Sequence, residues 1–215
     1  MFKASIAQFL VKNQSEVFGN IVQAFHGIDQ TTTNDAWIGE IDIMQQVLQP
    51  WRNEDAYIFF EYDIPRLGKR IDVVLLIKGV VFCLEFKVGK REALQSDMEQ
   101  VLDYALDLKN FHLYSNDRPI APILVPTEYE RTTLDIQPSV YDDEIFNPLI
   151  SGQKHLQNTI MRVLEVGAKE YDRTMWGDNW LISPYSPTPT IIEAARTLYE
   201  NHTDEDITRH EADKV

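Results

Sequence analysis

The sequence contains a single cysteine, Cys83, among its 215 residues. One thiol cannot form an internal disulfide, so the chain suits a reducing compartment, and no Cys/His spacing suggests zinc. Long apolar runs are also missing: the longest have five residues, at 56–60, 73–77 and 80–84. A membrane-spanning helix needs about 20 apolar residues, and the N-terminus lacks the pattern of a signal peptide. We therefore expect a cytoplasmic protein with no membrane partner.

Basic residues are scarce as well. Twenty Lys and Arg stand against 34 Asp and Glu, a formal net charge of −14, and such an average argues against a nucleic-acid partner. The distribution is uneven, however. Residues 64–91 hold seven basic and two acidic side chains, a net charge of +5, whereas residues 128–148 hold one basic and six acidic ones, a net charge of −5. The local basic segment is the part that needs a functional explanation.

With 44% hydrophobic and 25% charged residues, the composition is that of a globular domain. Apolar periodicity predicts two short helices before residue 30 and further helices at 36–48, 92–111, 154–171 and 190–201. Strands are predicted at 56–64, 71–77, 80–88 and 120–127, the second and third joined as a hairpin by a tight turn at Lys78-Gly79. Residues 128–152 are expected to be an acidic loop, and 176–190 an extended connector. The central order α-β-β-β-α-β predicts an α/β fold.

Two acidic residues stand at the open end of the predicted hairpin. Asp72 opens one strand and Glu85 closes the other, so the turn at 78–79 brings them opposite each other to within about a residue. Glu85 and Lys87 share one strand face. Two carboxylates, with a strand carbonyl such as that of Phe86, are suitable ligands for Mg²⁺ or Mn²⁺, and a lysine beside them can hold an attacking water and stabilise charge on a phosphorane. Taken alone, the same spacing also fits a solvated strand end with a surface ion pair.

The neighbouring helices offer further candidates. Gln100 and Tyr104 lie four apart on one helix stripe, from which they can reach the amine, the water or a substrate phosphate. An ordinary boundary pair fits them equally well. Glu40 flanks the core face of its own helix, as a third site acid or as a surface glutamate.

The basic segment surrounds the proposed metal strands. Two of its arginines directly precede Asp72, and Gly68 permits a sharp turn there, which favours phosphate contact over simple charge balance. The residues expected to contact nucleic acid are Arg66, Lys69, Arg70, Lys90 and Arg91.

These features resemble the PD-(D/E)XK nuclease superfamily, whose core order is αβββαβ. The resemblance rests on FEYDIPRLGKRIDVVLLIKGVVFCLEFKVG at 60–89, followed by QVLDYALDLKNFH at 100–112. It implies a restriction-endonuclease-like fold with a mixed sheet flanked by helices, a divalent metal, and products with 5′-phosphate and 3′-hydroxyl ends. Carried over by position, the metal ligands are Asp72 and Glu85, the catalytic lysine is Lys87, the ancillary Q-x-x-x-Y pair is Gln100 and Tyr104, and the first-helix acid is Glu40.

A narrower similarity concerns the amino-terminal part of bacterial Schlafen-like DNA/RNA helicase proteins, in which a nuclease-like domain precedes a superfamily 1 ATPase. It rests on the same stretch, with PILVPTE at 122–128 and YSPTPTIIEAARTLY at 185–199. Ile71 replaces the name-giving proline. No G-x-x-x-x-G-K-[ST] motif is present, so the chain is not itself the helicase. We expect a fragment of such a protein, or a stand-alone version.

On this basis the expected organisation is a helical extension (1–30), a nuclease core (31–130), a helical and connector region packed on it (131–200), and a polar tail or linker (201–215). The leading hypothesis is a Mg²⁺-dependent nuclease that acts on DNA in preference to RNA, with a helicase domain as partner and homo-oligomerisation left open. One alternative is a nuclease-like domain that only binds nucleic acid. Another is an interaction module that docks a partner protein or the motor through the acidic 128–144 and aromatic 176–190 segments.

Overall fold

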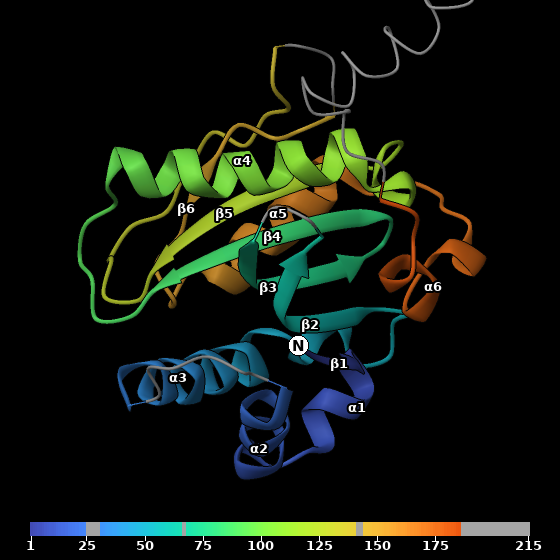
Figure 1. Cartoon of the computed structure of the whole chain (residues 1–215). Helices are drawn as coiled ribbons and strands as arrows, with labels where there is room; N and C mark the ends of the chain where they lie inside the picture. The colour runs from blue at the N-terminus through green and yellow to red at the C-terminus, as the bar shows by residue number, and fades with distance from the viewer. Residues whose placement is uncertain (25–30, 66–67, 141–143, 186–215) are drawn as a thin grey trace, which may run out of the picture. The chain divides into compact units, whose positions relative to one another are not determined.

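A mixed β-sheet forms the centre of the computed structural model, which describes residues 1–24, 31–65, 68–140 and 144–185 (Figure 1). Within those ranges the sheet has six strands in the order β1-β2-β3-β4-β5-β6. Strands β1 to β4 pair antiparallel, whereas β4, β5 and β6 pair parallel. The α/β prediction is confirmed. The strands are β1 (Phe2–Ser5), β2 (Tyr57–Ile64), β3 (Lys69–Ile77), β4 (Val80–Lys87), β5 (Ile120–Pro126) and β6 (Leu149–Ile150).

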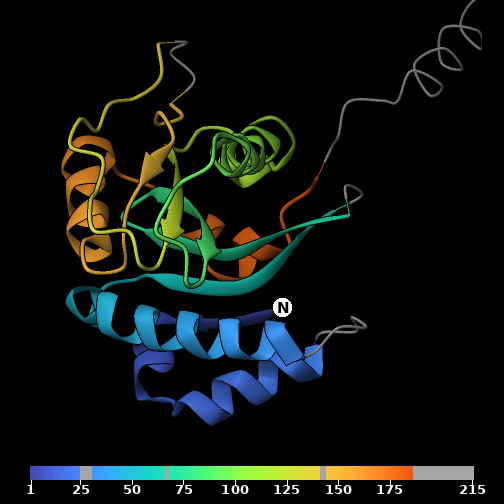
Figure 2. The ribbon, with the colours of Figure 1, turned by 90° about the vertical axis from the view of Figure 1, so that its left-hand side faces the viewer.

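Helices cover both faces of the sheet, as Figure 2 shows with α4 seen nearly end-on. One face packs against α1, α2, α3 and α5 in a single apolar cluster, and the other packs against α4 and α6 in a second cluster. The helices are α1 (Ile6–Val11), α2 (Gln14–Ala24), α3 (Thr31–Val47), α4 (Gln95–Phe111), α5 (Leu156–Gly167) and α6 (Asp178–Leu181), with 3-10 turns at Gln49–Trp51, Leu113–Ser115 and Arg173–Met175. Within the described ranges, none of these helices has the length and apolarity needed to cross a membrane.

The β3–β4 hairpin forms where the sequence predicts it. Ile77 pairs with Val80 across the turn, and both turn residues have positive φ, 48° at Lys78 and 80° at Gly79, as a two-residue turn of the I′ type requires. A Cβ at Gly79 would also lie 2.6 Å from the Lys169 carbonyl oxygen, so glycine is needed here for space as well as for conformation.

Several shorter elements depart from the predictions. The N-terminal segment, expected to be purely helical, begins with β1, which pairs with β2 at the sheet edge. The segment 128–152, expected to be a loop, contributes β6 to the other edge. Strands of four and two residues are too short for their periodicity to stand out, and their hydrogen-bond partners lie far away in the sequence. The helix predicted at 190–201 and the polar tail lie outside the described residues.

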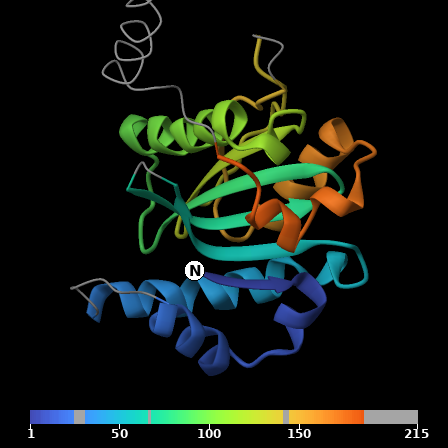
Figure 3. The same ribbon diagram turned by 45° about the vertical axis from the view of Figure 1, so that its right-hand side comes forward.

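The segment 173–185 is also more compact than the extended connector predicted for 176–190. Figure 3 shows α6 lying against the sheet on the side of α4. Trp176 and Trp180 are 4% and 0% exposed and belong to the α4-side cluster, so both are core residues. Cys83 is buried in the same cluster, and burial raises the pKa of its thiol.

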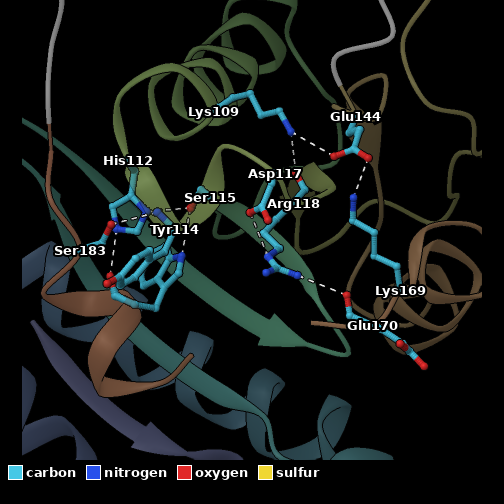
Figure 4. A network of polar contacts seen from close by, with 11 residues as sticks. Lys109, His112, Tyr114, Ser115, Asp117, Arg118, Glu144, Lys169, Glu170 and Ser183 are labelled. Carbon is cyan, nitrogen blue, oxygen red and sulfur yellow. Dashed lines mark hydrogen bonds and ion pairs between the residues drawn. The ribbon is translucent and has the colours of Figure 1, made fainter. Parts of the chain in front are cut away.

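A polar network fixes this segment to the end of α4 (Figure 4). His112, the C-cap of α4, contacts Ser115 Oγ at 2.8 Å and the Trp180 carbonyl oxygen at 3.0 Å, while the Trp180 indole donates to the same Ser115 hydroxyl at 3.0 Å. Nearby, Glu144 accepts hydrogen bonds from Lys109 and Lys169. This network lies at the opposite end of α4 from Gln100, so it supports the fold rather than the candidate site.

Candidate active site

The proposed metal ligands lie where strands β3 and β4 part. The ladder between them ends at Val73 opposite Leu84, one residue before Asp72 and Glu85. Beyond that point β4 stays paired with β5, and the backbone N–H of Phe86 donates to Asp72 Oδ2 at 2.8 Å. The β3–β4 ladder does not extend to Phe86. The Asp72 carboxylate therefore accepts the hydrogen bond of the Phe86 N–H, which would otherwise lack a partner. The two acids meet as the hairpin register predicted.

In strands β2 and β3, the alternation of side chains between the two faces of the sheet breaks at neighbouring positions. In β3, Val74 and Leu76 pack toward α4, and so does Ile71, which breaks the two-residue alternation at Asp72. In β2 the same break falls at Glu61, whose φ of 58° is unusual for a residue with a side chain. Pairing resumes beyond the break in the same register. Glu61 and Asp72, which would be paired in a regular ladder, are not paired, and the acidic side chains of the site lie at this interruption.

A chain of hydrogen bonds links the strand residues to α4. Lys87 Nζ donates to Glu85 Oε1 at 2.9 Å and to Gln100 Oε1 at 3.3 Å, and it lies 3.5 Å from Asp97 Oδ1. Gln100 Nε2 in turn donates to the Tyr104 hydroxyl at 2.6 Å. The structure therefore brings together, in one contact network, the strand and helix residues that the sequence singled out separately.

The network faces a pocket of about 480 Å³. Its lining includes Asp72 and Glu85 from the strands, Gln100 and Tyr104 from α4, and Lys69 and Arg70 from the start of β3. A volume of this size admits part of a nucleotide chain rather than a whole macromolecule. Carboxylates, an amide, a phenol and two cations thus converge on one opening.

The charges at the site are unfavourable for the protein by itself. Burial raises the pKa of Asp72 well above its usual range, and the nearby Glu85 carboxylate raises it further. Burial also raises the pKa of Glu85, although its hydrogen bond with Lys87 opposes the effect. Burial lowers the pKa of Lys87, but Glu85, Asp97 and Asp72 outweigh it and leave the pKa above its usual value. Lys87 is therefore a cation at neutral pH.

Two further buried acids approach from the α3 side. Glu40 is 4% exposed, and burial followed by the charges of Asp72 and Glu61 raises its pKa well above the usual range. Glu61 accepts a hydrogen bond of 2.6 Å from the Trp37 indole and forms an ion pair with Arg70. The structure places Glu40 among the site acids and not on the surface. Glu61 was not predicted, and its one signal in the sequence was an acid directly after the apolar run at 56–60.

The basic residues at the pocket are held by acids of the protein itself. Lys69 Nζ lies 3.7 Å from Asp103 Oδ2 and 3.8 Å from Asp107 Oδ2, both on α4. Arg70 pairs with Glu61. The predicted cations are thus at the opening, but each has an intramolecular partner.

The other predicted cations lie elsewhere. Lys90 and Arg91 are exposed on the loop after β4, where Arg91 pairs with Glu128 at 2.7 Å, and neither lines the pocket. Arg66 lies outside the described residues. These three residues remain predicted nucleic-acid contacts.

The donor set fits a hard divalent cation at two carboxylates. In the part of the chain that the structure describes, no three His, Cys, Asp or Glu side chains form a ready metal cluster. However, Glu85 Oε2 is buried without a hydrogen-bond partner beside Asp72, and Glu40 Oε2 is likewise without one. Mg²⁺ is commonly bound through one or two carboxylates, with waters and substrate phosphates completing its shell. Asp72 and Glu85 meet that requirement, whereas ligation by the Phe86 carbonyl remains a prediction.

No protein-family model matches the chain, and no curated protein matches it by sequence. The geometry of the site is therefore the basis for a proposed function.

Proposed function

We propose that the protein is a metal-dependent nuclease that hydrolyses phosphodiester bonds of DNA, a PD-(D/E)XK enzyme of the Q-x-x-x-Y type. The observation that carries the proposal is the contact network from Glu85 through Lys87 to Gln100 and Tyr104, with Asp72 beside Glu85 in the lining of one pocket. A solvated strand end with a surface ion pair would leave these groups exposed, and Glu85 is only 5% exposed. Burying several charged groups together is costly unless they serve a purpose.

Asp72 and Glu85 would hold Mg²⁺, with Mn²⁺ as a substitute. When bound, such an ion lowers the pKa of a water ligand and stabilises negative charge at phosphorus. Glu85 is suited to this role because Lys87 occupies only its Oε1, which leaves Oε2 for the metal. Asp72 is held in place through Oδ2 by the Phe86 N–H. Glu40 is a third buried acid beside these ligands, and burial raises its pKa.

Lys87 acts as an ammonium ion, because its carboxylate neighbours raise its pKa. In that form it cannot accept a proton from water. Its role is to donate hydrogen bonds, so it orients the attacking water and stabilises the charge that builds on the non-bridging oxygens in the transition state. Gln100 fixes the ammonium through Oε1, and Tyr104 fixes the Gln100 amide in turn. The Tyr104 hydroxyl accepts a hydrogen bond from Gln100, so its own proton is left to donate to a substrate phosphate.

The same proposal includes a superfamily 1 helicase or ATPase as the functional partner, in line with the resemblance to Schlafen-like helicase proteins. A motor that delivers nucleic acid would complement a domain with a net charge of −14, which by itself attracts polyanions poorly. We place this nuclease in the cytoplasm.

The test is cleavage of supercoiled plasmid, single-stranded circular DNA and structured RNA with Mg²⁺, Mn²⁺ or EDTA. Wild type is compared with Lys87→Met and with Lys12→Met, a matched control whose ion pair with Glu16 lies in the N-terminal helices. We expect metal-dependent cutting that Lys87→Met reduces by 10²-fold or more, the size of effect that one positioned donor supplies. Lys12→Met should cut like wild type.

Two results would refute the nuclease. If Lys87→Met, shown to be folded by circular dichroism, cuts at the wild-type rate, the lysine has no catalytic part. If wild type binds DNA but cuts none of the substrates with any metal, even with a helicase partner added, the domain is a nucleic-acid-binding module instead.

A further inference from the structure

The ion pairs of Lys69 connect two walls of the pocket. Lys69 is the first residue of β3, whereas Asp103 and Asp107 lie on α4, next to Gln100 and Tyr104. Both N–O distances, 3.7 and 3.8 Å, are longer than a hydrogen bond. The Lys69 side chain is 44% exposed and lines the pocket, so the ammonium is both accessible and only loosely held.

The two acids differ in their surroundings. The Asp103 side chain is 59% exposed, whereas that of Asp107 is 17% exposed, and Asp107 Oδ2 is buried without a hydrogen bond. The Lys69 ammonium therefore lies beside a partly desolvated carboxylate that makes no closer polar contact through that oxygen. Carboxylate oxygens and phosphate oxygens compete for the same ammonium donors.

We propose that Asp103 and Asp107 are internal competitors of substrate phosphate, which hold Lys69 across the pocket until a phosphate of the nucleic acid takes its ammonium. Lys69 is then a substrate-binding residue, and the two aspartates set the affinity of the site without touching the substrate. This inference rests on the proposed binding of nucleic acid at the pocket, but it does not require cleavage.

The exchange has a small energetic scale. Exposed ion pairs at such distances contribute little, so freeing Lys69 changes binding several-fold and not by orders of magnitude. Competition of this strength lowers the affinity for polyanions that contact only Lys69, whereas a substrate that fills the whole pocket stays well bound. These ion pairs also account for the charge of the basic segment at the pocket, because both of its described pocket cations, Lys69 and Arg70, have acidic partners.

Binding of a fluorescein-labelled single-stranded DNA oligonucleotide tests the proposal, with Ca²⁺ in place of Mg²⁺ to suppress cutting. The variants are Asp103→Asn/Asp107→Asn, Lys69→Met and their triple combination. The matched control is Glu92→Gln/Glu99→Gln, which removes the same two negative charges at exposed positions with no contact to Lys69. Amide hydrogen exchange of residues 62–64 and 69–71, without DNA, reports whether α4 holds the start of β3.

We expect Asp103→Asn/Asp107→Asn to tighten binding about three- to five-fold, more than the control variant, and to speed exchange at residues 69–71. In the Lys69→Met background the same two substitutions should gain less, because no ammonium remains to be released. An equal gain in both backgrounds, or unchanged exchange, overturns the proposal.

The proposed nuclease fails in a different way. Wild type that binds the oligonucleotide and shows the expected coupling, but never cuts, contradicts the nuclease and leaves the inference intact. Wild type that cuts, with no coupling between Lys69 and the aspartates, overturns the inference alone. Wild type that binds no DNA refutes both.

Discussion

If the buried carboxylates bind the proposed metal, we expect the metal to have a large effect on thermal stability. Asp72 and Glu85 lie side by side, and burial raises the pKa of both. A carboxyl group with a raised folded-state pKa adds stability that is fully present below its ordinary pKa and is lost as the pH rises through the raised value. At neutral pH the metal-free site therefore destabilises the fold, and the proposed divalent cation would offset this cost.

The size of the effect follows from mass action. A metal ion at 100 times its dissociation constant stabilises the folded state by about 2.7 kcal/mol. For a chain of this length each kcal/mol raises the melting temperature by about 2–4 °C, so the expected increase is about 5–10 °C. Asp72→Asn should melt higher than wild type in EDTA at pH 7.5, because it removes one of the repelling charges, and should gain little from Mg²⁺ or Mn²⁺.

Differential scanning fluorimetry with a metal titration measures both quantities. Asp63→Asn is the matched control, since Asp63 lines the same pocket from β2 and is exposed. It should keep the metal-dependent increase. The reasoning is refuted if Asp72→Asn gains as much from metal as wild type, or if it melts lower than wild type in EDTA by several degrees.

Three further predictions concern the contacts around the site and the core. Gln100→Ala should lower the rate constant of DNA cleavage more than Tyr104→Phe, because Gln100 contacts the Lys87 ammonium and Tyr104 does not; single-turnover kinetics measure both, and equal rates contradict the order. Trp180→Ala should destabilise the fold by about 3–5 kcal/mol in urea denaturation, because the indole is fully buried, and a loss below 1 kcal/mol would contradict its core role. Burial lowers the pKa of His112 to about 4, so stability should fall by about 3 kcal/mol as the pH drops from about 6.5 to 4; His112→Gln should lose that pH dependence in melting experiments.

The sequence contains enough information for the central hairpin and its site. Two continuous apolar runs and the Lys78-Gly79 turn between them determine the register, and the register brings Asp72 opposite Glu85. Helical spacing places Gln100 and Tyr104 on one stripe, which the structure turns toward Lys87. These are local patterns whose geometric consequences are short-ranged, and local geometry is what a sequence reveals best.

The residues that contact the site residues are harder to predict from sequence. Glu61 reaches the site because its backbone adopts a positive φ, and no residue pattern in β2 announces that conformation. The acids that pair with Lys69 lie more than 30 positions further along the chain, on α4, so the basic segment alone suggested free cations. Short edge strands such as β1 were missed for a similar reason, since their pairing is determined by a distant neighbour.

The burial of Trp176 and Trp180 against the α4 side of the sheet has a consequence for biosynthesis. All the proposed catalytic residues have been translated once Tyr104 is added, but the apolar layer that supports them is completed only by these two tryptophans. Because a domain folds as a unit during synthesis, the nascent chain would expose an uncovered sheet face until more than 70 further residues have been added. The proposed catalytic site is therefore assembled late in synthesis, after the acidic segment 128–148 has been translated.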